Sequence, residues 1–179
     1  MPLIRHRFAE HKVNTQTEVL VIGTFNPEAS ENKADFFYGR DRNFLWTLIP
    51  SAFGDVSLKG KSKKEKLEYI NKRKIDFIDL ITEVNVDKPD NYHDAYLDKK
   101  VSKWTDVISE IEKFKKIKRV CFTRKTFSDI PIMKIKVEEI EAFCKRNDIT
   151  FQCLTTPARF YRADKQQEWS NFLNDDPRL

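Results

Sequence analysis

The stretch VLVIGTFNPEAS, residues 19–30, decides the fold, because it joins an apolar run to a glycine and then to an Asn-Pro pair. Its β-branched residues are typical of a buried strand. Gly23 allows the backbone to turn tightly or to approach a ligand closely, and Pro27 favours an extended conformation for Asn26. The Asn26 amide offers a donor and an acceptor where the strand ends. Alternatively, the Asn-Pro pair only ends the strand.

Three further apolar runs have the same strand character, and amphipathic segments separate the four runs. The alternation predicts parallel strands joined by helical crossovers. We therefore expect an α/β fold, a three-layer α/β/α arrangement around a central, mainly parallel four-stranded sheet, in a single domain spanning residues 1–179. The expected strands are 18–23, 75–81, 118–123 and 150–154, and the expected helices are 43–53, 61–73, 101–116, 137–147 and 163–174.

Composition narrows the class of protein. The chain has 179 residues, 40% of them hydrophobic, and 14 phenylalanines, which suffice for a sizeable core. Its apolar runs are too short for a membrane span, and the N-terminus lacks the apolar region of a secretory signal. Three cysteines without a CxxC spacing argue against a disulfide framework and a four-cysteine iron–sulfur cluster. We expect a cytoplasmic monomer with no metal, cofactor or membrane partner.

The charge is unevenly distributed. The net charge is +5, and residues 59–74 (KGKSKKEKLEYINKRK) contain eight basic and two acidic side chains. Phosphate backbones attract such a segment irrespective of base sequence. The other interpretation is a helix face with its lysines in water. Taken alone, the composition of residues 59–74 favours this second interpretation.

Two further segments combine aromatic and arginine residues. ADFFYGRDRNFLWTL, residues 34–48, places three aromatic residues beside Arg40 and Arg42. This combination suits the stacking of bases on the aromatic rings next to phosphate contacts by the arginines. The alternative is that the aromatic side chains belong to the hydrophobic core. Asp41 is a candidate N-cap for the helix that follows. LTTPARFYR, residues 154–162, follows the last strand, and its hydroxyls and amides suit phosphate binding, although an ordinary loop is an equal alternative.

The ends of parallel strands meet at one edge of a sheet, where ligands bind. The segments GTFNPE, ITEVNVD and LTTPARFYR each follow an expected strand, so we expect them to converge. The chemistry of the protein should lie there.

Together these segments resemble the uracil-DNA glycosylase superfamily, in particular its mismatch-specific uracil and hypoxanthine-DNA glycosylase branches. Gly23, Asn26 and Pro27 are similar to a Gly-x-(Asn or another residue)-Pro-Gly motif, with one more residue between the glycine and the proline, and YGRDRNFLW at 38–46 resembles an aromatic-Ala-His-Pro-x-Asn-x-Phe-Trp motif. LTTPA resembles the minor-groove loop. The resemblance extends from about residue 18 to 173. The chain differs in having Glu28 in place of a glycine and no histidine near Thr155.

The resemblance implies a DNA base-excision repair enzyme that flips a deaminated base, uracil or hypoxanthine, out of DNA and hydrolyses its N-glycosidic bond. It implies that Asn26 is catalytic. The base-binding residues would be Gly23, Thr24, Phe25, Phe37, Tyr38, Asn43 and Thr82, and the DNA-binding residues would be Arg40, Arg42, Thr155, Thr156, Pro157, Arg159 and Phe160.

Two alternatives stay open. The missing histidine and the altered GTFNPE loop favour a non-catalytic nucleic-acid-binding module on the same fold. An unrelated α/β enzyme acting on a nucleotide would use the same cleft, but the chain has no GxGxxG or GxxxxGK[ST] loop. Glu28 is either a general base or, as we prefer, a helix cap.

Overall fold

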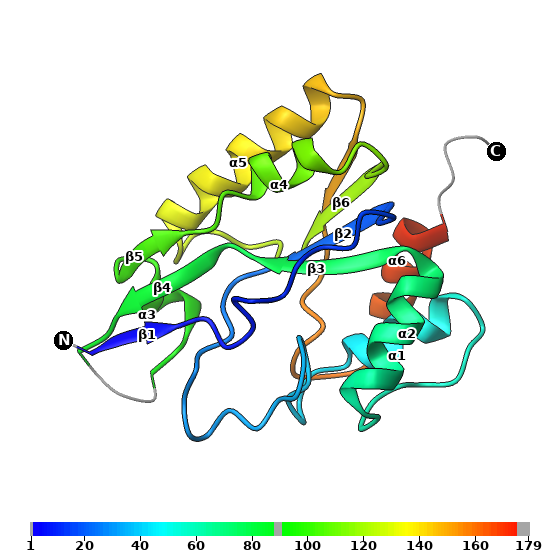
Figure 1. The fold of residues 1–179 in the computed structure, drawn as a ribbon, viewed down its shortest axis with the longest axis horizontal. Helices are drawn as coiled ribbons and strands as arrows, with labels where there is room; N and C mark the ends of the chain where they lie inside the picture. Colours follow the sequence, from blue (N-terminus) through cyan, green and yellow to red (C-terminus); the bar gives the residue numbers. More distant parts are fainter. Residues whose placement is uncertain (1, 88–90, 175–179) are drawn as a thin grey trace.

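A four-stranded, all-parallel sheet forms the centre of the computed structural model, which describes residues 2–87 and 91–174 (Figure 1). The strand order is β3-β2-β6-β7. Every residue of the neighbouring strands β2 and β3 is buried, as expected for parallel strands covered on both faces. The expected α/β fold with its parallel sheet is therefore confirmed. The strands are β2 (Val19–Gly23), β3 (Ile75–Asp79), β6 (Arg119–Phe122) and β7 (Thr150–Cys153).

Helices cover both faces of this sheet, and two clusters of buried side chains hold them there. One cluster unites one face of the sheet with α4 and α5, and the other unites the opposite face with α1, α2 and α6 (Figure 1). A short helix, α3, follows β4 along the chain. The helices are α1 (Leu45–Ala52), α2 (Lys63–Arg73), α3 (Asp94–Leu97), α4 (Val107–Lys113), α5 (Pro131–Arg146) and α6 (Ala163–Asn174).

A second sheet, which the sequence patterns did not predict, extends from the first. It is antiparallel, with the order β1-β4-β5, and consists of β1 (Leu3–Arg5), β4 (Ile81–Asn85) and β5 (Val101–Trp104). The apolar run 75–81 was expected to be one strand. The chain instead leaves the parallel sheet after Asp79 and enters β4 at Ile81.

The predicted helix at 101–116 is wrong over its first part. Residues Val101–Trp104 form β5, and Trp104 pairs with Ile81 of β4. The apolar spacing of this segment fits a helix, but pairing with β4 overrides that local preference. The helix begins only after Asp106, whose Oδ1 accepts a hydrogen bond of 3.1 Å from the Ser109 amide.

The expected caps also differ from the observed ones. Asp41 is exposed and lies outside α1, and the Asn43 side chain instead accepts a 3.0 Å hydrogen bond from the Leu45 amide at the start of that helix. Glu28 lies in a non-helical loop between β2 and α1, so it caps neither of the flanking elements, and its carboxylate instead forms a 3.1 Å ion pair with Arg7.

Candidate functional site

Backbone hydrogen bonds bring the strand-end segments together. The Leu80 amide donates to the Gly23 carbonyl at 3.0 Å, so the chain after β3 lies against the chain after β2. The Phe44 amide donates to the Pro157 carbonyl at 2.9 Å, and the Arg159 amide to the Arg42 carbonyl at 2.7 Å. The segment containing the two arginines is thus attached to the loop after β7. Of ITEVNVD, the Ile81 amide donates to the Thr24 carbonyl at 3.1 Å, and from Ile81 the segment continues away as β4 (Ile81–Asn85).

A buried polar cluster lies where β2 and β3 end. Its centre is Asp79, the last residue of β3, which is 4% exposed. Asp79 Oδ2 accepts two hydrogen bonds of 2.7 Å, one from Asn26 Nδ2 and one from His6 Nε2. A carboxylate can only accept hydrogen bonds, so the side-chain amide of Asn26 must point its nitrogen toward Asp79. The side-chain carbonyl oxygen of Asn26 therefore points away from Asp79.

The N-terminal segment supplies the third member of this cluster. The His6 amide donates to the Thr82 carbonyl at 2.8 Å, and the Arg7 amide donates to the Asn26 carbonyl at 2.8 Å. These bonds place the segment between β4 and the loop after β2, with His6 7% exposed. The sequence patterns indicate neither His6 nor Asp79. Neither stands in a recognisable motif, although two aspartates, Asp76 and Asp79, within one fully buried strand are an unusual feature.

Gly23 and Tyr38 close the other side of Asp79. A Cβ atom on Gly23 would lie 2.2 Å from Asp79 Oδ1 and 2.7 Å from Tyr38 Oη, so only glycine permits this arrangement. Tyr38 adopts a positive φ of 55°. Burial raises the pKa of its phenol well above the ordinary value, and the Asp79 charge adds to the rise. The nearby Thr123 side chain partly offsets this rise in the pKa of Tyr38, but it is not in hydrogen-bond geometry with the Tyr38 hydroxyl. That hydroxyl has no hydrogen-bond partner among the described residues.

The remaining predicted base-binding residues occupy different surroundings. Phe37 is 2% exposed and packs in the core, with its ring 5.1 Å from Phe8 and 5.8 Å from Phe77. Phe25 lies edge-on to the His6 ring at 5.8 Å. The Thr82 hydroxyl pairs with Thr105 at 3.0 Å.

Both arginines of the second segment stay exposed. Partial burial lowers the pKa of the Arg40 guanidinium, and the charge of Asp79 opposes this change. Arg42 is connected through its carbonyl to the loop after β7.

That loop presents an exposed tip on a fixed base. Lys165 of α6, 5% exposed, donates to the carbonyls of Ala158 at 3.1 Å and Phe160 at 2.6 Å. Arg159 has a φ of 76°, and the Phe160 side chain is 61% exposed. An exposed aromatic and an exposed arginine on a clamped loop suit insertion into a duplex.

The threonines of this loop have local partners. The Thr155 amide donates to Glu168 at 3.0 Å, and the Thr156 hydroxyl accepts from the Ala158 amide at 3.3 Å. Pro157 is buried beneath the loop.

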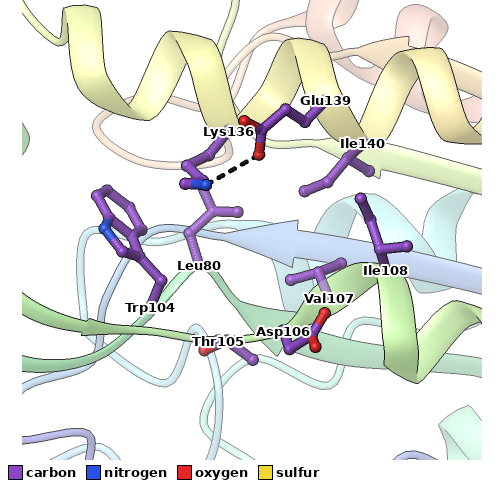
Figure 2. Close-up of a pocket in the computed structure, with 9 residues that line it drawn as sticks. All are labelled: Leu80, Trp104, Thr105, Asp106, Val107, Ile108, Lys136, Glu139 and Ile140. Atoms are coloured by element: carbon purple, nitrogen blue, oxygen red, sulfur yellow. Dashed lines mark hydrogen bonds and ion pairs between the residues drawn. The ribbon is translucent and has the colours of Figure 1, made fainter.

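Two cavities lie near the ends of these strands, and only the first is lined by residues of the cluster. It has a volume of about 270 Å³ and is lined by His6, Asp79 and Thr82 along the edge of β3. The second, of about 230 Å³, lies between α4 and α5, with Leu80 and Trp104 in its wall and the Lys136–Glu139 ion pair of α5 on one side (Figure 2). Neither is lined by Asn26, Tyr38 or Thr156.

Two further observations bear on ligands and membranes. Among residues 2–87 and 91–174, no group of three or more His, Cys, Asp or Glu residues could hold a metal ion. No helix in the same part of the chain is long and apolar enough to cross a membrane.

Comparison with known proteins supports the fold. No protein-family model matches the chain, and no curated protein matches it. The solution NMR structure of a "putative Uracil DNA glycosylase" from Methanosarcina acetivorans superposes with a TM-score of 0.63. The two sequences are 19% identical, and the match covers 90% of this chain and 91% of the other. At this identity the similarity establishes a shared fold.

Proposed function

We propose that the protein is a monofunctional DNA glycosylase, which flips a deaminated base out of DNA and hydrolyses the bond between that base and its sugar. Uracil and hypoxanthine are the bases that we propose. Flipping is required because the bond is inaccessible inside the stacked duplex, and unstacking a base costs a few kcal/mol.

The observation that carries this proposal is the buried cluster of Asn26, Asp79 and Tyr38 at the carboxyl ends of the strands. Ligands of α/β sheets bind at that edge. Asn26 projects its carbonyl oxygen away from Asp79, where it can accept a hydrogen bond from a water or from the edge of a base. The cluster thus offers the groups that can position a water and stabilise charge in the transition state.

The loop after β7 supports the same function. Arg159 and Phe160 are exposed on a loop that Lys165 fixes, and this loop is hydrogen-bonded to the segment that bears Arg40 and Arg42. In our proposal, Phe160 or Arg159 fills the gap left by the flipped nucleotide, and the arginines contact phosphates. The fold shared with the Methanosarcina protein agrees with this proposal.

The test is base release from duplexes that each contain one uracil, hypoxanthine, xanthine or mismatched thymine, followed by alkaline cleavage at the abasic site. We expect release of one base by the native protein and a large loss in Asn26→Ala and Tyr38→Ala. Ser170→Ala, on the half-buried part of α6, serves as a control that should keep the native rate. Salt-sensitive DNA binding without any release would instead identify a non-catalytic binding module.

A further inference from the structure

Asp79 has one carboxylate oxygen that the fold leaves unpaired. Its Oδ2 accepts hydrogen bonds from His6 and Asn26. Its Oδ1 is buried and has no hydrogen-bond partner among the described residues. Leaving a buried polar atom without a partner destabilises the fold, so each such atom calls for an explanation, such as a ligand or a reaction that uses it. The free oxygen lies beside Gly23, at the end of β2.

The partners of Asp79 are fixed in one protonation pattern. The Phe8 amide donates to His6 Nδ1 at 3.0 Å, so that nitrogen must be the acceptor of the ring. The His6 proton therefore lies on Nε2, which donates to Asp79. Both ring nitrogens are occupied, and His6 has no free nitrogen with which to exchange a proton with a substrate. Asn26 is a poor base because it is a neutral amide.

Tyr38 complements Asp79 from the other side of Gly23. Its hydroxyl is the second buried atom at this point without a hydrogen-bond partner among the described residues. Because the pKa of Tyr38 is raised, the phenol keeps its proton and acts as a donor. An acceptor and a donor, each without a hydrogen-bond partner among the described residues, therefore both lie beside Gly23 at the end of β2.

We propose that Asp79 is the catalytic base of the glycosylase reaction, an assignment that rests on the proposed function. Its Oδ1 takes a proton from the attacking water while the water oxygen forms a bond to C1′ of the flipped nucleotide. The bond between C1′ and the base nitrogen breaks, and its electron pair leaves with the base as an anion. Tyr38 donates a hydrogen bond to that anion. His6 and Asn26 are positioning residues, which hold Asp79 through Oδ2.

The experiment compares single-turnover base release by the native protein, Asp79→Asn and Asp76→Asn. Asp76 is a matched control, since it is a buried aspartate on the same strand that pairs with His11 at 2.7 Å. We expect Asp79→Asn to lose about 10²- to 10⁴-fold in rate, the range typical of general-base catalysis. Its affinity for a duplex containing an abasic-site analogue should be unchanged. Asp76→Asn should keep the native rate.

Folding and proton transfer separate a chemical role from a structural one. Asp79→Asn should keep a cooperative urea unfolding transition like that of the native protein while base release is lost. If Asp79→Asn does not fold, the native protein decides, because single-turnover release that is equally fast in heavy water would show that no proton moves in the rate-limiting step and would overturn the assignment.

Other outcomes identify which proposal is wrong. A folded Asp79→Asn protein that releases the base at the native rate would overturn the role of Asp79 and leave the glycosylase proposal intact. Release of a different base by Asp79→Asn would also overturn it, because Asp79 would then read the base. Absence of release by the native protein on every duplex would overturn the proposed function itself, and this assignment with it.

Discussion

Replacing Gly23 by alanine tests whether Asp79 and Tyr38 are held as closely as the structure indicates. The new Cβ would lie 2.2 Å from Asp79 Oδ1 and 2.7 Å from Tyr38 Oη, whereas ordinary contacts begin at 3.4 Å. The carboxylate must therefore retreat by about 1.2 Å, which strains its 2.7 Å bonds to His6 and Asn26. All these groups are buried, so no side chain can swing into solvent.

The magnitude follows from three contributions. Overpacking a buried site costs about 1–3 kcal/mol, and loss of one hydrogen bond to a charged group costs about 1.5–3 kcal/mol. Alanine restricts the unfolded chain, which returns about 0.4–1 kcal/mol. Together these contributions lower the free energy of unfolding of Gly23→Ala by about 1.5–5.5 kcal/mol. For a chain of this size, that is a fall in Tm of roughly 3–22 °C.

Urea denaturation of a double-mutant cycle measures this effect. In a background carrying Asp79→Ala and Tyr38→Phe, which removes the clashing oxygens, Gly23→Ala should cost at least about 1 kcal/mol less, because the sites are in contact. The reasoning fails if Gly23→Ala costs less than about 0.5 kcal/mol, the range of neutral surface changes. It also fails if the cost is equal in both backgrounds.

Four further changes have defined outcomes. Ser62→Ala removes the capping box at the start of α2 and should lower the free energy of unfolding by about 1 kcal/mol in urea. Lys165→Met removes two hydrogen bonds to the loop after β7, and should weaken binding to an abasic duplex in titrations while α6 still folds. Arg159→Ala should reduce the salt slope of DNA binding by about 1, if Arg159 contacts one phosphate. Burial raises the pKa of Tyr69 to about 12. The contribution of Tyr69 to the free energy of unfolding is therefore complete below pH 10 and is lost as the pH approaches 12. In alkaline denaturation, Tyr69→Phe should lack this loss.

The parallel sheet was predictable because each of its strands is a short apolar run that a helical pattern follows. Residues 19–23 and 75–79 are buried on both faces, so their apolar side chains are visible without any alternation. The antiparallel sheet was not predictable from the same signals. Residues 101–104 pair with β4 although their spacing suits a helix, and residues 3–5 are too few to show a pattern.

The candidate site was predicted only in part, and the reason is topological. Asn26 and Tyr38 stand in recognisable segments, and the structure brings both to Asp79. His6 reaches the same point from 73 residues away along the chain, through pairing of the N-terminal segment with β4. No local pattern records a partner at that separation. The role of Asp79 became visible only through its two hydrogen bonds and its unpaired oxygen.

The structure of the native protein bound to a duplex with an abasic-site analogue would show whether the Asp79 cluster acts on DNA. We expect the flipped sugar to lie against Asp79, Asn26 and Tyr38, within roughly the 3–3.5 Å needed between reacting atoms. We also expect Phe160 or Arg159 to occupy the gap in the duplex. A duplex bound only along residues 59–74, with its nucleotides stacked and the Asp79 cluster uncontacted, would rule out this role.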